Sequence, residues 1–285
     1  MTCSAEVCRW VKDRRFWLTH ASTVLLATAA VLLIFFCQVQ LHAQKAPPED
    51  AGATPGQAGA VCERDSGNVL WWLAQSCARD LKSNAGCRVF AQDGGEDYII
   101  LKDNNMRRKP AGYLAIPVSC VTGIEDSQVF SPAIVDLWEE AWLWSGRYPG
   151  EPAARTGLAI NSKRGRSQNQ LHIHISCIRS DVAHDLAAKN IPMYPAKAVA
   201  MHLPPADNRY QVVKVTGLAG DNSPFKVMLA ALGHKEGATV KDGDMQDQSI
   251  AVVGTEKAGE FYVLLTTANG ANDGHAEELL DQTCR

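Results

Sequence analysis

The segment that most constrains this chain is 171–175, LHIHI, in which apolar and polar residues alternate strictly. Side chains of a β-strand point alternately to its two faces, so this period predicts a half-buried strand. Leu171, Ile173 and Ile175 should face the core, and His172 and His174 should stand side by side on the other face. Two imidazoles on a rigid strand are candidates for catalysis or for metal binding. A polar sheet face without any function is the simpler alternative.

A polar loop precedes this strand. Residues 161–169 contain no apolar side chain, and Gly165 lets the backbone turn. The loop and the residue after it carry three cations and four amides: Lys163, Arg164, Arg166, Asn161, Gln168, Asn169 and Gln170. Such donors suit a phosphate ester or anhydride better than a zinc ion, because a phosphate offers several charged acceptor oxygens.

The segment 160–182, INSKRGRSQNQLHIHISCIRSDV, resembles the active-site region of the bacterial CDP-diacylglycerol pyrophosphatase family. Its strand is similar to that of the wider histidine triad superfamily, whose pattern is His-φ-His-φ-His-φ-φ, with φ an apolar residue. The resemblance implies that His172 attacks phosphorus and forms a nucleotidyl-histidine, and that His174 matches the third histidine. Gln170 takes the place of the first histidine, where an amide can still donate and accept hydrogen bonds.

The same resemblance implies a reaction and further site residues. CDP-diacylglycerol, a membrane lipid, would be hydrolysed to phosphatidate and CMP by a phosphoric anhydride hydrolase that needs no cofactor and no metal. Arg166 matches a family arginine, and Ser167 matches a hydroxyl near the leaving-group oxygen. Arg166, Lys163 and the loop amides would stabilise the equatorial phosphoryl oxygens. Secondary pocket candidates are Lys102, Asp103 and residues 122–126.

The remaining pattern predicts an α+β fold. Helices are expected at 68–79, 131–145, 182–189 and 276–284. Asn68 would cap the first helix, and Ser131 or Asp136 would open the second. Strands are expected at 97–103, 112–117, 171–175, 210–215, 225–232, 249–253 and 261–266. The order of hairpin, helix, strand, cationic loop and histidine strand resembles the histidine triad fold, an antiparallel sheet with flanking helices.

The amino terminus predicts a membrane anchor. Residues 1–15 include four basic side chains, and residues 16–39 include no charged one. As a helix, the second segment would span about 36 Å, enough for a bilayer core. The basic flank should stay cytoplasmic, which places a single-pass chain in the bacterial inner membrane with its catalytic domain, 62–285, outside the cytoplasm. Residues 40–61 would form a flexible Pro/Ala/Gly linker. A cleaved signal peptide is the alternative.

Six of the nine cysteines follow the predicted anchor and would lie outside the cytoplasm, where disulfides persist. Relatives carry cysteines at similar places, so the resemblance implies the disulfides Cys77–Cys87 and Cys177–Cys284. Cys62 could pair with Cys120, or both could stay free. No C-x-x-C spacing occurs, which argues against a structural zinc.

Two other functions stay open. In the first, His172 and His174 bind zinc with a distant ligand, and the chain is a metal-dependent phosphoesterase. In the second, the chain is a non-enzymatic module that binds a nucleotide or lipid. The net charge of −3 argues against a nucleic-acid partner, and the sequence does not indicate an oligomeric state. The scattered histidines are interpreted as surface residues: His184, His202, His234 and His275.

Overall fold

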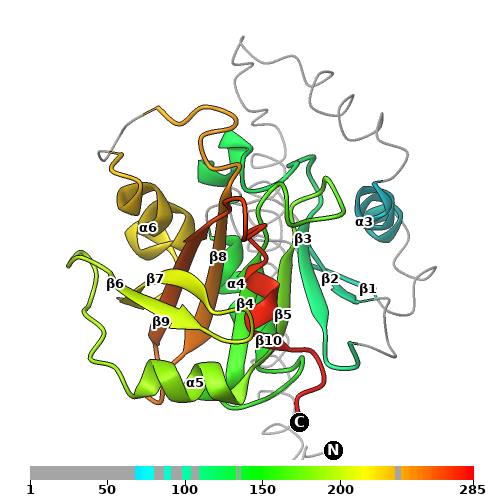
Figure 1. The fold of residues 1–285 in the computed structure, drawn as a ribbon. Coiled ribbons are helices and arrows are strands. Elements are labelled where there is room, and N and C mark those ends of the chain that lie inside the picture. The colour runs from blue at the N-terminus through cyan, green and yellow to red at the C-terminus, as the bar shows by residue number, and fades with distance from the viewer. Residues whose placement is uncertain are drawn as a thin grey trace, which may run out of the picture. The chain divides into compact units, whose positions relative to one another are not determined.

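The structure is a computed structural model that describes residues 68–79, 87–90, 98–103, 109–132, 134, 136–234 and 239–285. The expected anchor at 16–39 and linker at 40–61 lie outside these residues. No helix within the described ranges is long and apolar enough to cross a membrane. Figure 1 shows one large sheet with helices around it, which confirms the α+β prediction.

The described residues form ten strands, all paired antiparallel: β1 (Cys87–Phe90), β2 (Tyr98–Lys102), β3 (Tyr113–Pro117), β4 (Thr156–Ile160), β5 (Ile173–Ile178), β6 (Val199–Leu203), β7 (Asn208–Thr216), β8 (Gln248–Gly254), β9 (Glu260–Thr267) and β10 (Leu280–Asp281). Their order across the sheet is β1-β2-β3-β5-β4-β8-β9-β7-β6, and β10 pairs with β5. The histidine strand β5 is therefore internal, between β3 and β4.

Four α-helices accompany these strands in the described part: α3 (Val69–Arg79), α4 (Leu137–Ser145), α5 (Ser180–Ala187) and α6 (Pro224–Ala231). Four short 3₁₀ helices connect them: η1 (Ser127–Phe130), η2 (Ala153–Arg155), η3 (Gly220–Asn222) and η4 (Ala276–Leu279). The cap predicted for α3 is present, since the side-chain oxygen of Asn68 accepts a hydrogen bond from the backbone N–H of Trp71 at 3.4 Å.

Helices α4 and α6 cover one face of the sheet. Trp138 of α4 and Phe225 of α6 pack edge to face, with 5.6 Å between ring centroids. They belong to the same apolar cluster as Ile173 and Ile175 of β5. The predicted faces of 171–175 are therefore confirmed, because the apolar residues are buried in this main core and the histidines point the other way. The strand itself begins at Ile173 and both of its faces are buried, so the prediction of a half-buried strand is wrong.

The opposite face carries two separate apolar clusters. In one, Ala74 of α3 packs with Leu114 of β3. In the other, Leu186 of α5 and Leu279 of η4 pack with Ala159 of β4. His174 pairs in register with Leu114 on one side and with Ala159 on the other. It therefore lies in the gap between the two clusters, where polar groups can meet without interrupting either core.

Two predicted elements are wrong. Residues 225–232 form helix α6 and not a strand, because Pro224 starts a helix well and Gly233, at φ +84°, ends it. Residues 276–284 form the single turn η4 followed by strand β10, not a closing helix. Pairing of Leu280 with Ile178 of β5 outweighs the local helical preference of this segment.

The disulfide between Cys177 and Cys284 is present, with the two Cα atoms 5.3 Å apart. It fastens the carboxyl terminus to β5, next to the pairing of β10. Cys77 and Cys120 are each disulfide-bonded as well, so Cys120 is not a free thiol. The pairing of Cys77 with Cys87 stays a prediction, because the side chain of Cys87 is outside the described part.

Candidate functional site

The two histidines of the strand lie at the floor of the site. His172 immediately precedes β5 and His174 lies within it, with their ring centroids 4.8 Å apart. They are 9% and 6% exposed, respectively. Burial lowers the pKa of His172 below its usual range and that of His174 to about 3. Both rings are therefore neutral near pH 7.

The hydrogen bond of His172 fixes its tautomer. Its Nδ1 lies 2.7 Å from the backbone oxygen of Gln170. A carbonyl oxygen can only accept, so Nδ1 carries the proton and Nε2 carries the lone pair. Since the ring also lines the cavity described below, this neutral tautomer gives a nucleophile that needs no base to activate it.

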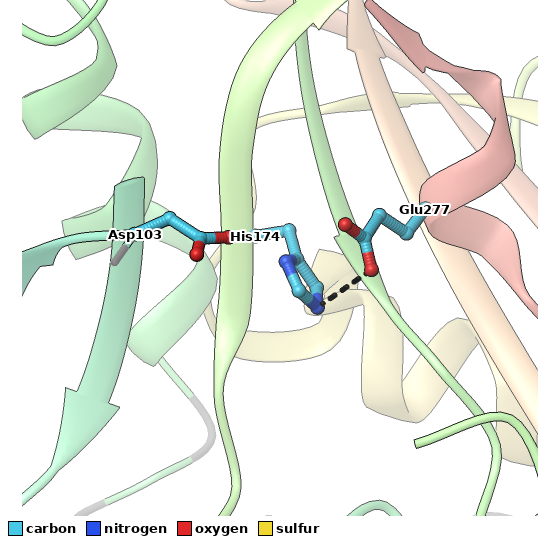
Figure 2. A group of neighbouring side chains, drawn as sticks. All are labelled: Asp103, His174 and Glu277. Atoms are coloured by element: carbon cyan, nitrogen blue, oxygen red, sulfur yellow. Dashed lines mark ion pairs between the residues drawn. The ribbon is translucent and has the colours of Figure 1, made fainter. Parts of the chain in front are cut away.

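The second histidine is next to a carboxylate from the far end of the chain. Nε2 of His174 lies 3.2 Å from Oε2 of Glu277 in η4, and Figure 2 marks this contact with a dashed line. The distance would suit an ion pair if His174 were protonated, but burial keeps the ring neutral, and Nε2 has no hydrogen-bond partner. We conclude that the contact is electrostatic, and that a small rotation of the ring would complete a hydrogen bond.

Glu277 is held in place by a set of polar contacts. Its carboxylate accepts hydrogen bonds from the side chains of Asn161, at 3.2 Å, and Gln282, at 3.1 Å. Its backbone N–H donates to the side-chain oxygen of Asn161 at 3.0 Å. Burial alone would raise the pKa of Glu277, but the neighbouring His174 and the ion pair with Lys109 outweigh it and lower the pKa to about 2. Glu277 is therefore ionised at neutral pH.

Lys109 bridges two carboxylates beside the histidines. Its ammonium pairs with Asp103 at 3.2 Å and with Glu277. Burial would lower the pKa of Lys109, but these partners raise it overall. Asp103, His174 and Glu277 also place potential metal-ligand atoms within 4.8 Å of one another. This donor set suits a divalent metal, yet the charge of Lys109 already neutralises the carboxylates that such an ion would need.

The cationic loop is organised by a buried ion pair. Arg166 binds Glu125 through both terminal nitrogens, one contact measuring 2.6 Å, and their side chains are only 4% and 7% exposed. Gly123 makes this approach possible, because a Cβ there would come within 2.4 Å of the guanidinium. The terminal nitrogen Nη2 of Arg166 also donates to the side-chain oxygen of Asn169 at 3.2 Å, whereas Nε is buried without a hydrogen-bond partner.

A cavity of about 480 Å³ opens over these groups. It is lined by Leu70, Asp103, Lys109, Leu114, Asn161, Arg164, Gly165, Arg166, Ser167, Gln168, His172, His174, His275 and Glu277. The structure thus brings together both predicted histidines and six of the other predicted residues: Asp103, Asn161, Arg164, Arg166, Ser167 and Gln168. The lining is mostly polar, with apolar side chains from two leucines, which suits a charged ligand.

Four of the individually predicted residues do not line this cavity, and neither do the candidates at 122–126. Lys163 is exposed, and its backbone N–H donates to Gln246. The backbone oxygen of Asn169 accepts from Asn68, and the amine of Lys102 lies 4.0 Å from the centre of the Tyr113 ring.

The fourth residue, Gln170, is fully buried. Its amide donates to the backbone oxygens of Pro117 and Ser119. It thereby fixes the entry of β5, and its own carbonyl holds the His172 ring. Gln170 therefore supports the nucleophile from behind and does not reach the cavity.

Three polar lining residues were missed by the sequence reasoning: Lys109, His275 and Glu277. No local pattern distinguishes Lys109 or Glu277, because each acquires its role through partners far away in the chain. No sequence pattern identified His275 as a site residue either. It approaches the loop because Gly165 leaves room, where a Cβ would lie 2.3 Å from the imidazole.

Two comparisons with known proteins match most of this chain. The model of the CDP-diacylglycerol pyrophosphatase family matches residues 65–285. A relative from Yersinia pestis, described as "CDP-diacylglycerol pyrophosphatase", is 31% identical over 232 residues, which covers 76% of this chain and 84% of the relative. The matched region contains every residue of the cavity.

Proposed function

Since this chain belongs to the CDP-diacylglycerol pyrophosphatase family, we propose that it hydrolyses CDP-diacylglycerol to phosphatidate and CMP through a covalent intermediate on His172. The observation that carries the covalent step is the hydrogen bond from His172 Nδ1 to Gln170. It leaves Nε2 unprotonated in a ring that burial keeps neutral. The buried, preoriented imidazole is poised for attack on phosphorus.

The chemistry proceeds in two steps. The lone pair of His172 Nε2 attacks the cytidylyl phosphorus, a P–N bond forms, and the bond to the bridging oxygen breaks. Phosphatidate leaves as a phosphate monoester with a second pKa of about 6, so it needs little protonation. Water then attacks the same phosphorus, the P–N bond breaks, and CMP is released together with a proton.

The surrounding side chains orient and stabilise the reacting group. Ser167 and Gln168 line the cavity beside the histidines, and we assign Ser167 to the leaving oxygen. Glu277, held by Asn161, orients His174, which would position the attacking water in the second step. Fixed dipoles of this kind stabilise developing charge at no cost in reorganisation.

The mass of the intermediate tests the covalent step. Quenched turnover should show a CMP-sized mass increase on the peptide that contains His172. His172→Ala should abolish the adduct and lower turnover by about 10⁴-fold or more. His174→Ala should slow turnover about a hundredfold and keep the adduct. The exposed His184 offers the matched control His184→Ala, which should change neither. Full activity of His172→Ala would remove the proposed nucleophile.

Labelled water tests which phosphorus is attacked. On the proposed route, water oxygen enters CMP and not phosphatidate, because the second step occurs at the cytidylyl phosphorus. Label found in phosphatidate alone would reverse the assignment of the two ends of the substrate.

A metal-dependent phosphoesterase is the second candidate, and one observation favours it. Asp103, His174 and Glu277 form a compact donor set, although it contains only His174 of the histidine pair expected from the sequence. Loss of activity on chelation and recovery with zinc would support this rival. Retained activity after exhaustive chelation would support attack by His172.

The proposal extends to the fold type and to the location of the protein. The internal strand β5, with its cationic loop and neutral histidines, supports a histidine triad type of site. The basic segment 1–15 and the uncharged segment 16–39 support a single-pass anchor in the inner membrane with the catalytic domain outside. A reporter fused after residue 60 should be active as a periplasmic type, and cytoplasmic activity would contradict this orientation.

A further inference from the structure

Helix α3 exposes a small apolar face at the edge of the site. Val69 and Trp72 are 52% and 46% exposed. They are three residues apart and therefore neighbours on the helix surface. The buried side of the same helix carries Trp71, Ala74 and Cys77, so the exposed pair is not needed for the core. Figure 1 shows α3 at the end of the sheet that contains β1, β2 and β3.

This helix is directly connected to the cavity. Leu70 is one of the lining residues, and its backbone N–H donates to the side-chain oxygen of Gln168 at 3.2 Å. The side chain of Asn68 donates to the backbone oxygen of Asn169 at 3.1 Å. The start of α3 and the cationic loop therefore form one rim, with Leu70 on the cavity side and Val69 and Trp72 on the outer side.

The cavity cannot accommodate the acyl chains of a diacylglycerol lipid. Its apolar lining consists of Leu70 and Leu114, and the remaining lining is polar or charged apart from Gly165. Each methylene drawn from a bilayer into water lowers the equilibrium about fourfold. The acyl chains must therefore stay in the bilayer during the reaction, and the rim of the cavity must come to the bilayer surface.

The assignment of Ser167 to the leaving oxygen indicates which part of the rim comes to the bilayer surface. If Ser167 is near the leaving oxygen, phosphatidate lies on the side of Ser167 and Gln168, and Gln168 contacts α3. The other exposed large apolar side chains of the described part are Leu143 and Leu232. Leu143 lies on α4, across the sheet from the histidines, and Leu232 follows α6 on that same far side. The pair on α3 is thus the exposed apolar surface beside the cavity.

We infer that Val69 and Trp72 of α3 dock the catalytic domain on the phospholipid bilayer, so that the diacylglycerol end of the substrate leaves the cavity past Leu70. Tryptophan suits this place, because its ring is amphipathic and prefers the membrane–water interface. Arg79, exposed in the last turn of the helix, adds attraction for anionic lipid head groups. This inference rests on the proposed function, since the position of Ser167 relative to the leaving group comes from that mechanism.

Two substrates and a double variant test the docking surface in the full chain. Val69→Ser/Trp72→Ser should lower kcat/KM for long-chain CDP-diacylglycerol in anionic phospholipid vesicles by at least about tenfold, mainly through KM. The same variant should hydrolyse a short-chain, water-soluble CDP-diacylglycerol within about twofold of the wild-type rate. The matched control Leu143→Ser removes a more exposed apolar side chain, at 64%, and should change neither rate.

Several outcomes would overturn the inference. Equal losses of kcat/KM on both substrates would show that Val69 and Trp72 stabilise the catalytic site and do not dock on the bilayer. An unchanged rate on vesicles would place the membrane contact elsewhere, and a wild-type dimer that the variant converts to a monomer would assign this face to a second copy of the chain. A wild-type chain that hydrolyses neither CDP-lipid would instead overturn the proposed function, and this inference with it. Unchanged thermal midpoints of both variants verify that the fold is intact.

Discussion

The neutral state of His174 makes the stability of the fold sensitive to mild acid. Burial is the largest cause of its low pKa of about 3, and His172 and Lys109 act in the same direction, whereas Glu277 and Asp103 oppose them. The unfolded chain should protonate this side chain with the ordinary pKa of 6.5. Between these two values the unfolded state binds more protons than the folded state, so the free energy of unfolding falls as the pH falls.

The size of this effect follows from the two pKa values. The difference between the folded and unfolded pKa values of His174 corresponds to about 4 to 5 kcal/mol of unfolding free energy, which is an upper bound. Most of it lies below pH 5, but roughly 2 kcal/mol should be lost between pH 7 and pH 5. For a domain of this size, that loss corresponds to a decrease in thermal midpoint of about 4 to 8 °C.

Urea unfolding at pH 7 and pH 5 isolates this contribution when wild type is compared with His174→Gln. Glutamine places an amide near the position of Nε2 but does not titrate. The free energy of unfolding of wild type should therefore fall by roughly 2 kcal/mol more than that of the variant. Glu277, with a pKa of about 2, stays ionised throughout this range. The exposed His184 provides the control His184→Gln, which should leave the pH dependence of wild type unchanged.

The opposite sign would refute the reasoning. If Glu277 kept His174 protonated in the folded state, the folded pKa would exceed 6.5, and acid would stabilise wild type relative to the glutamine variant. The electrostatic contact of 3.2 Å would then outweigh burial, and His174 would have to act as a cation in the mechanism.

Three further predictions concern the supports of the site. Glu125→Gln leaves the buried charge of Arg166 unpaired, so urea unfolding should show a free energy of unfolding lower by about 3 to 5 kcal/mol. The control Glu151→Gln breaks the more exposed ion pair with Arg155 and should lower the same free energy by about 1 kcal/mol or less. Lys109→Met removes the ammonium from between two carboxylates, so the variant should retain stoichiometric zinc after gel filtration. Wild type is the control, and stoichiometric zinc retained by wild type would contradict this prediction. Cys284→Ser opens a loop spanning 107 residues and should cost about 4 to 5 kcal/mol on the chain-entropy model with turnover preserved, whereas an unchanged urea midpoint would contradict it.

The central strand could be predicted from the sequence because its signal is local. The period of two in 171–175 sufficed to assign the apolar and polar faces of β5, although not the burial of the polar face. The polar composition of 161–169 sufficed to predict a loop beside them. The hairpin of β2 and β3 and the cap of α3 were predictable for the same reason. In each case neighbouring residues determine the structure, and tertiary contacts agree with the local preference.

Glu277 and Lys109 could not be predicted, because their roles arise from long-range contacts. Glu277 reaches His174 because β10 pairs with β5 and because Ala276 and Leu279 are buried on the same face of the sheet. Local composition favoured a helix in this segment, which would have directed its side chains differently. The prediction of a strand at 225–232 was wrong for a related reason, because a short apolar run is compatible with both a buried helix and a strand.

The charges around the cavity are paired before any substrate binds, and this determines how the reaction can be catalysed. Arg166 is neutralised by Glu125, and Lys109 lies between Asp103 and Glu277. A cation that is already paired attracts a pyrophosphate less strongly, because the anion also meets repulsion from the carboxylate. The equatorial oxygens must then rely on the cavity-lining Arg164, which makes only an exposed ion pair with Asp273, and on the neutral hydroxyl, amide and backbone N–H donors of the loop. A neutral imidazole nucleophile fits such a site, because it approaches the phosphorus without the repulsion that an anionic nucleophile would meet.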